Sequence, residues 1–119
     1  MIKQIKSSEI KKFIQSNPKT ILLDVRTEDE WNTVGKPDTE ALGIKSYFIT
    51  ISQDSSFLEN VKKKIKKDSP VLVSCAAGGR SLIAANLLEQ EGYTALNVSD
   101  GFSGNGQDPG WKNSGLPTK

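Results

Sequence analysis

The chain contains no histidine and a single cysteine, Cys75, among its 119 residues. Without histidine, a Ser-His-Asp triad, a Cys-His pair or an imidazole metal site cannot form. One cysteine cannot make an internal disulfide, a Cys-x-x-Cys redox pair or a thiolate zinc cage. We therefore expect no metal ion and no cofactor. Any nucleophilic or acid–base chemistry must use carboxylates, lysines, hydroxyls or this one thiol.

Long hydrophobic runs are also missing. No apolar run approaches the roughly 20 residues that cross a membrane, and the opening residues MIKQIKSSEIKK lack the apolar segment of a secretory signal. We therefore expect a cytoplasmic protein with no membrane partner. A reducing cytoplasm would keep Cys75 available as a free thiol.

The charge is nearly balanced, with 16 Lys and Arg against 14 Asp and Glu and a formal net charge of +2. This excess is too small to indicate a nucleic-acid partner. The basic residues do cluster between positions 62 and 67, where five lysines stand. They form either the solvated C-terminal end of a helix, where cations suit the helix dipole, or a docking patch for an anionic ligand or acidic partner.

Length and composition predict one globular domain over residues 1–119. Short β-rich runs alternate with helical patterns. Strands are predicted at residues 2–5, 21–25, 47–51, 71–73 and 93–98. Helices are predicted after the N-cap candidates Ser7 and Ser8, after the capping boxes Thr27–Glu30 and Ser56–Glu59, and from Arg80 to a stop at Gly92. Beyond Ser99 we expect Trp111 and Leu116 to hold a Gly-rich tail against the body. The alternation predicts parallel strand pairing and an α/β layered fold, with its site at the carboxyl ends of the strands.

The most informative segment is VLVSCAAGGRSLIAANLLEQEG, in which a buried strand leads to Cys75. A loop of small residues follows, and then a helix opens; the segment after the cysteine is Ala76, Ala77, Gly78, Gly79, Arg80 and Ser81. The glycines allow a tight curl whose N–H groups point inward as an anion-binding nest, next to the positive end of the helix dipole. A cysteine in this setting is expected to be a thiolate, which is a nucleophile without a separate base. The alternative is that Cys75 is a small buried hydrophobe, but the loop and its arginine favour the nucleophile.

Both arginines of the chain, Arg26 and Arg80, are expected at the carboxyl ends of predicted strands. Asp24 stands two residues before Arg26. Two interpretations remain open for Asp24 and Arg26. They either form an ordinary structural ion pair or brace the Cys75 loop and set its electrostatics.

These segments resemble the rhodanese (sulfurtransferase) family, in its small single-domain form, over almost the whole chain. LLDVRTEDEW at residues 22–31 is similar to the family pattern LLDVR-x-x-x-E-aromatic, and CAAGGRS at residues 75–81 is similar to its Cys-x-x-x-x-Arg-Ser loop. Gly92-Tyr93, Gly101-Phe102, Trp111 and Gly115-Leu116-Pro117 follow in the family's order. The chain departs from the family where GKPDTEALGIKS replaces the usual Gly-His-Ile-Pro-Gly-Ala segment, where Ala76 replaces a basic residue, and in a longer stretch at residues 103–109.

The resemblance implies a three-layer fold with a central, mainly parallel sheet of about five strands flanked by helices. It implies a sulfurtransferase in which Cys75 takes sulfane sulfur from thiosulfate or a persulfide. The Cys75 persulfide would then pass the sulfur to cyanide, a small thiol or a protein thiol. The backbone from Ala76 to Ser81 would cradle the persulfide and an anionic donor, and Arg80 would add charge or lock the loop. With Ala76 in place of a cation, a persulfide donor or a protein partner becomes more plausible than thiosulfate.

Two alternatives belong to other functional classes. One is a rhodanese-like regulatory or binding module, or a protein-persulfide carrier, with little turnover of its own. The other is a small cysteine phosphatase or an arsenate-reductase-like enzyme. Such phosphatases have five residues between cysteine and arginine, whereas four lie between Cys75 and Arg80, and the loop holds no carboxylate to act as a leaving-group acid. The sequence leaves open the oligomeric state and whether the tail covers the site.

Overall fold

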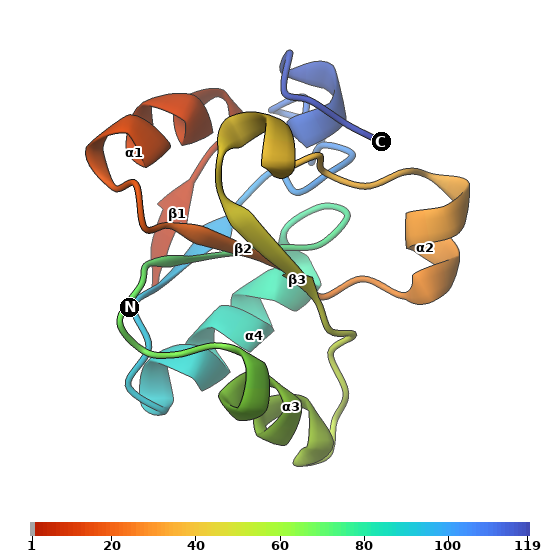
Figure 1. Ribbon diagram of the computed structural model, residues 1–119. Coiled ribbons are helices and arrows are strands. Elements are labelled where there is room, and N and C mark those ends of the chain that lie inside the picture. Colours follow the sequence, from red (N-terminus) through yellow and green to blue (C-terminus); the bar gives the residue numbers. More distant parts are fainter. Residues whose placement is uncertain (1) are drawn as a thin grey trace.

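The computed structural model describes residues 2–119 and is built around a parallel sheet (Figure 1). Its strands lie in the order β1-β5-β4-β2-β3, and every neighbouring pair is parallel. The strands are β1 (Lys3–Ile5), β2 (Ile21–Asp24), β3 (Lys45–Phe48), β4 (Val71–Ser74) and β5 (Ala95–Val98). The predicted α/β fold with a central sheet of about five parallel strands is confirmed.

Helices cover both faces of the sheet, because parallel strands need crossover connections. Figure 1 shows α1 (Ile10–Ser16) on one side of the sheet, and α3 (Ser56–Lys64) and α4 (Gly79–Gln90) on the other. The short α2 (Glu28–Thr33) projects at the side, beyond the end of β2. Three single-turn 3-10 helices complete the path at Ser7–Glu9, Glu40–Leu42 and Trp111–Asn113.

The two faces of the sheet enclose separate hydrophobic cores. Successive strand residues point to opposite faces, so Leu22 and Leu72 pack with α1 and Trp111, whereas Leu23 and Val73 pack with α3 and α4. All four residues of β2 and all four of β4 are buried. Burial on both faces explains why these two central strands are continuous apolar runs. Because β2 and β4 are parallel neighbours, their carboxyl ends lie side by side at one edge of the sheet.

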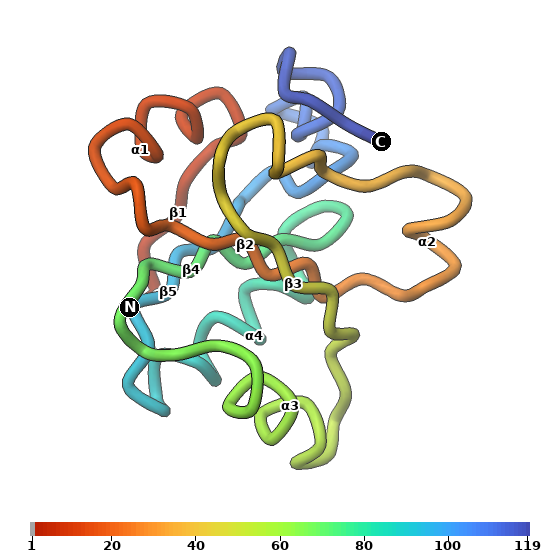
Figure 2. Tube along the Cα trace, viewed as in Figure 1, coloured from red at the N-terminus to blue at the C-terminus, as the bar shows by residue number. Residues whose placement is uncertain are grey.

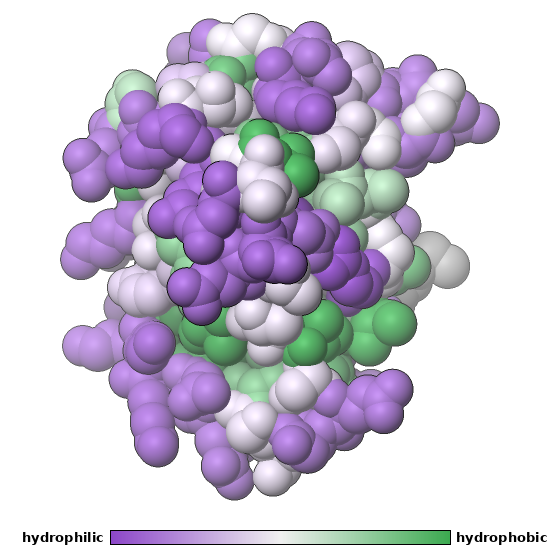
Figure 3. Space-filling model, turned by 90° about the vertical axis from the view of Figure 1, so that its right-hand side faces the viewer, coloured by the Kyte–Doolittle hydropathy of each residue, from purple (hydrophilic) through white to green (hydrophobic). Residues whose placement is uncertain are grey.

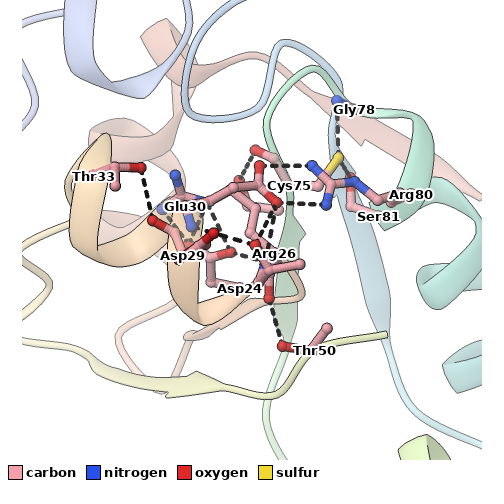
Figure 4. A network of polar contacts seen from close by, with 12 residues as sticks. Asp24, Arg26, Asp29, Glu30, Thr33, Thr50, Cys75, Gly78, Arg80 and Ser81 are labelled. Atoms are coloured by element: carbon pink, nitrogen blue, oxygen red, sulfur yellow. Dashed lines mark hydrogen bonds and ion pairs between the residues drawn. The ribbon is translucent and has the colours of Figure 1, made fainter. Parts of the chain in front are cut away.

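The capping box predicted at Thr27 is confirmed. The Glu30 N–H donates to Thr27 Oγ1 at 3.3 Å, and the Thr27 N–H donates to Glu30 Oε1 at 3.2 Å. This arrangement satisfies two of the N–H groups left free at the start of α2. It also fixes Glu30 at the foot of the helix, facing the carboxyl edge of the sheet (Figure 4).

The serine caps predicted for two other helices, Ser7 or Ser8 for α1 and Ser56 for α3, were wrong. The N-cap of α3 is Ser55 rather than Ser56, and the Ser56 N–H donates to Asp54 Oδ1 at 3.0 Å, so an aspartate turn supplies the acceptor. Ser7 does not cap α1, because its buried hydroxyl donates to Asp100 Oδ1 at 2.9 Å. In both cases the N–H of the serine donates to a carboxylate, that of Asp100 or Asp54.

Strand and helix ends also differ from the prediction. β3 ends at Phe48, β5 begins at Ala95, and α4 begins at Gly79, one residue before the predicted start. Gly92 follows α4 with φ +97°, as the predicted helix stop requires. At the end of α3, Lys62, Lys63 and Lys64 fill the last turn, and Lys62 pairs with Glu91 at 2.9 Å.

The tail is held against the body as predicted. Trp111 and Leu116 are buried, and the Trp111 indole N–H donates to the carbonyl oxygen of Pro117 at 2.7 Å. The backbones of Lys36 and Lys119 exchange two hydrogen bonds of 2.9 Å. Figure 2 shows the C-terminal end in blue, lying beside the chain that follows α2. Within residues 2–119, no helix has the length and hydrophobicity needed to cross a membrane.

Candidate active site

Cys75 lies at the carboxyl end of β4, at the start of the loop that leads into α4 (Figure 4). Its side chain is almost completely buried, at 1% exposure. Two donors point at the sulfur: the Gly78 N–H at 3.1 Å and the Ser81 hydroxyl at 3.3 Å. The loop therefore curls around Cys75, as the small residues and the glycines of the sequence predict.

These contacts favour the charged form of the thiol. Burial raises the pKa of Cys75, but hydrogen bonds from the Ser81 hydroxyl and from the N–H groups of Ser81, Ala77 and Gly78 lower it. The net result is a Cys75 pKa below its ordinary value. A cysteine in this position is more nucleophilic at neutral pH than a free cysteine.

The loop is shaped by close contact with the segment that follows β5. Gly78 has φ +97°, and a Cβ placed there would lie 2.2 Å from the Ser99 carbonyl oxygen. Gly101 has φ +58°, and a Cβ there would lie 2.5 Å from the carbonyl oxygen of Ala76. The N–H groups of Phe102 and Ser103 donate to the carbonyls of Cys75 and Ala76 at 2.8 and 2.9 Å. The start of the C-terminal segment thus supports the loop from its backbone side.

Arg80 forms a two-point ion pair with Glu30 of α2. Its Nη1 and Nη2 donate to Glu30 Oε1 and Oε2 at 2.7 and 2.9 Å, which is the parallel arrangement that guanidinium and carboxylate groups prefer (Figure 4). The hydrogen bond from Arg80 is the main reason why the pKa of Glu30 falls to about 2, and those from Thr27 add to it. The positive charge of Arg80 is therefore balanced by the carboxylate of Glu30, and this ion pair connects α4 to α2.

Asp24 and Arg26 form a buried ion pair beside the loop and make no hydrogen bond to Cys75. Arg26 Nη2 donates to Asp24 Oδ2 at 2.8 Å and to the Gly35 carbonyl oxygen at 2.9 Å. The guanidinium lies 4.3 Å from the centre of the Phe102 ring. The Phe102 N–H in turn donates to the Cys75 carbonyl, so the ion pair contacts the loop only indirectly, through Phe102.

Two polar residues at the site were not predicted from the sequence as site residues. Glu30 was assigned only a capping role, although it is the glutamate of the LLDVR-x-x-x-E pattern. Asn97 of β5 is buried at 1% exposure, and its Oδ1 accepts the Ser81 hydroxyl at 2.5 Å. The one signal for Asn97 was an amide inside the otherwise apolar strand ALNV.

The site offers backbone N–H groups, hydroxyls and one thiol. Among residues 2–119, no three His, Cys, Asp or Glu side chains come together in a group that could hold a metal ion. Ala77 and Gly79 are exposed, so the outer side of the loop is open to solvent. A small anion or a persulfide could be bound there by the backbone donors.

The parallel sheet, the Cys-x-x-x-x-Arg-Ser loop and the comparisons with known proteins agree: this chain belongs to the rhodanese-like family. Within that class, the family model that matches residues 4–119 is described as the STR4 middle domain. An uncharacterised protein of Rickettsia prowazekii is 37% identical over 98% of this chain and 97% of its own length. Thiosulfate sulfurtransferase 18 of Arabidopsis thaliana is 32% identical over 82% of this chain and 79% of its own length.

Solved structures show the same relationship. The crystal structure of Rv0390 from M. tuberculosis is 31% identical, has a TM-score of 0.84, and matches 98% of this chain and 96% of that one. The solution structure of the polysulfide-sulfur transferase homodimer from Wolinella succinogenes is 25% identical, with a TM-score of 0.75, over 99% of this chain and 78% of that one.

Proposed function

We propose that the protein is a sulfurtransferase that carries sulfane sulfur on Cys75 from a persulfide-type donor to an external thiol. The observation that carries this proposal is the Cys75 sulfur, which receives the Gly78 N–H and the Ser81 hydroxyl at the base of a backbone nest. These donors stabilise a thiolate in a chain that has no histidine to act as a base. Membership of a family that contains named thiosulfate and polysulfide sulfurtransferases supports the same chemistry.

The first step is a displacement at sulfur. The Cys75 thiolate attacks the outer sulfur of a donor R–S–S–H, a new S–S bond forms, and the donor's S–S bond breaks. Its electron pair leaves with the inner sulfur as R–S⁻, while Cys75 becomes a persulfide. In the second step an acceptor thiolate attacks the outer sulfur of that persulfide, takes it, and returns Cys75 to the thiolate. No net oxidant or reductant is needed.

The electrostatics favour a persulfide over thiosulfate as donor. Thiosulfate carries two negative charges, and a site for it would need free cations near the sulfur. Here the Arg80 charge is shared with Glu30, and Arg26 is paired with Asp24. Ala76 supplies no charge. A donor whose reacting group carries at most one negative charge, such as the persulfide group of glutathione persulfide, fits these surroundings better.

The acceptor must come from outside the chain, since no second cysteine exists to resolve the persulfide. The face that carries α2 is mostly hydrophilic, with hydrophobic side chains among the hydrophilic ones (Figure 3). Val34, after α2, is 44% exposed, and Ile83, one turn beyond Arg80, is 60% exposed. These apolar side chains are compatible with a protein thiol as acceptor. A reducing compartment such as the cytoplasm would supply both thiols and persulfides.

Mass spectrometry of the intact protein tests the proposal. After incubation with glutathione persulfide, the wild-type chain should gain about 32 Da, one sulfur atom, and lose it on addition of a thiol. A Cys75→Ser variant, which keeps the size of the side chain, should gain nothing. An unmodified wild-type thiol with persulfide, polysulfide and thiosulfate at neutral pH would refute the proposed function.

A persulfide carrier with little turnover is the second candidate, favoured by the 1% exposure of the Cys75 side chain. It predicts that the chain is loaded once but releases its sulfur slowly to small thiols. Measuring loading and release separately distinguishes the carrier from an enzyme with multiple turnovers. The phosphatase alternative has less support, because the four-residue loop closes tightly on the sulfur.

A further inference from the structure

The Ser81 hydroxyl lies between two acceptors and has one proton to donate. Cys75 Sγ is 3.3 Å away on one side, and Asn97 Oδ1 is 2.5 Å away on the other. All three side chains are buried, at 1% exposure or less. Because a hydroxyl has a single proton, Ser81 can donate to only one of these two acceptors at a time.

The orientation of the Asn97 amide is fixed by its other contacts. Its Nδ2 donates to the carbonyl oxygen of Gly78 at 3.0 Å and to Gln4 Oε1 at 2.8 Å. A backbone carbonyl can only accept, so Nδ2 must face Gly78 and the amide oxygen must face Ser81. Asn97 therefore presents Ser81 with an acceptor and never with a donor.

We infer that Asn97 is a positioning residue for Cys75, which acts by competing with the sulfur for the one proton of Ser81. When Cys75 is a neutral thiol, the Ser81 hydroxyl donates to Asn97 Oδ1, and the lone pairs of the Ser81 oxygen face the S–H of Cys75. When Cys75 is a thiolate, the hydroxyl turns to donate to the sulfur, and the Asn97 oxygen loses its partner. When Cys75 is a persulfide, the charge moves to the outer sulfur and the proton returns to Asn97.

Ser81 still stabilises the thiolate, but the competition from Asn97 weakens that stabilisation and so favours the thiol and the persulfide more than Ser81 alone would. The inference rests on the proposed function only in taking Cys75 as the nucleophile and in the persulfide state. Three charged groups lie beside the loop and have partners: Arg80 pairs with Glu30, Arg26 pairs with Asp24, and Asp100 accepts from Ser7 and the Gly110 N–H. None of these groups makes a hydrogen bond to Ser81 or Asn97.

The test is the pH dependence of Cys75 alkylation by iodoacetamide, which needs no sulfur donor. In Asn97→Leu, which is close to asparagine in size, Ser81 can donate only to the sulfur. We expect the alkylation midpoint to fall by about half a pH unit, or a roughly threefold rise in the ratio of thiolate to thiol below the midpoint. In a Ser81→Ala background the same substitution should leave the midpoint unchanged. Asn86→Leu, an exposed asparagine of α4, is the matched control.

A purely structural role gives a different result. If Asn97 only holds the loop, Asn97→Leu loosens the N–H groups around the sulfur and the midpoint rises. A rise, no change, or a fall that persists in the Ser81→Ala background would overturn the inference. If sulfur uptake fails while the midpoint falls as expected, the proposed function is wrong and the Asn97 inference stands.

A second measurement uses the wild-type chain and does not depend on the folding of a variant. The side-chain amide NMR signals of Asn97 should shift during a pH titration with the same midpoint as Cys75 alkylation, because the amide oxygen gains or loses the Ser81 proton. In Ser81→Ala the Asn97 signals should stay constant over that range. If the chemical shifts of the Asn97 side-chain amide in the wild-type protein did not change over the pH range in which Cys75 titrates, the inference would also be overturned.

Discussion

Glu30 holds the guanidinium of Arg80, which follows the Cys75 loop at the start of α4. Both oxygens of its carboxylate accept from Arg80, and its own position is fixed by Thr27 at the start of α2. A sulfur donor bound at the loop would therefore interact with the Arg80 cation and the Glu30 anion together, and their effects on its charge partly cancel. Removing the anion while keeping the shape of the side chain should change which donors are accepted.

We predict that Glu30→Gln raises the rate of sulfur uptake from thiosulfate relative to that from glutathione persulfide. The freed guanidinium would attract the doubly charged thiosulfate group more than a persulfide group with at most one negative charge, and one charge at this range is expected to change the ratio by about threefold to tenfold. The measurement is the ratio of the two uptake rates by mass spectrometry. Glu28→Gln is the matched control, because it makes the same charge change on α2 at a residue that does not pair with Arg80.

The effect should not vary with pH in the neutral range. The pKa of Glu30 is lowered to about 2 in the folded chain, while an unfolded glutamate titrates near about 4.3. The stabilisation by the pair is therefore fully present above the unfolded value and is lost as the pH falls through the folded one. The factor by which Glu30→Gln changes this ratio should stay constant between about pH 5 and pH 8, and a factor that varied would mean that another group of the protein sets the donor preference.

Distance along the sequence explains which site residues could be predicted from it. Cys75 and the loop up to Ser81 are contiguous, so strand, glycines and helix start could be interpreted together. Glu30 meets Arg80 across 50 positions, and Asn97 meets Ser81 across 16. Those partners depend on the strand order, in which β5 and β2 lie on either side of β4. No spacing along the chain encodes that order.

At the scale of elements, the Cys75 loop depends on the segment between β5 and the tail. Gly101 has a positive φ and lies against the backbone of Ala76, where a Cβ would come within 2.5 Å of a carbonyl oxygen. Gly106 also has a positive φ, of +90°, but a Cβ there would meet nothing within 4 Å. Substituting alanine at Gly106 therefore measures the free-energy cost of the positive φ alone, whereas the same substitution at Gly101 measures that cost together with the cost of the close contact.

We predict that Gly106→Ala lowers the free energy of unfolding by about 1 kcal/mol, the usual cost of a left-handed non-glycine residue. Gly101→Ala should lower it by roughly 2–4 kcal/mol, since the loop and the segment must also move apart. Urea denaturation measures both values, and sulfur uptake should be slowed only in Gly101→Ala. Equal losses for the two variants would show that the contact with Ala76 does not support the loop.

Helix starts show why elements were easier to predict than their ends. The apolar runs and the 3.6-residue period placed every strand and helix, since burial of a whole face is spread over many residues. A cap depends on one acceptor. Thr27 kept its predicted role because the carboxylate of its own turn, Glu30, accepts the Thr27 N–H and completes the box, whereas the N–H groups of Ser56 and Ser7 donate to Asp54 and Asp100, which lie outside the predicted boxes.

On the scale of the whole molecule, the Asp24–Arg26 pair joins parts of the chain that are far apart in sequence. Arg26 bonds to the loop after α2 at Gly35 and stacks on Phe102 of the C-terminal segment. That loop in turn is paired with the C-terminal end, where the backbones of Lys36 and Lys119 are bonded. The pair is 1% and 0% exposed, so neither charge can be solvated by water.

We predict that Arg26→Met lowers the free energy of unfolding by about 3–5 kcal/mol, because Asp24 would remain as a buried charge without its partner. Adding Asp24→Leu should restore most of that loss, since two apolar side chains of similar volume replace the pair without an uncompensated charge. Urea denaturation of the wild type, the single variant and the double variant provides the comparison. If stability returns but sulfur uptake stays slow, the pair serves mainly to orient the Cys75 loop through Phe102. If the double variant remains as unstable as Arg26→Met, the bond to Gly35 and the stacking on Phe102 stabilise the fold more than the neutralisation of Asp24 does.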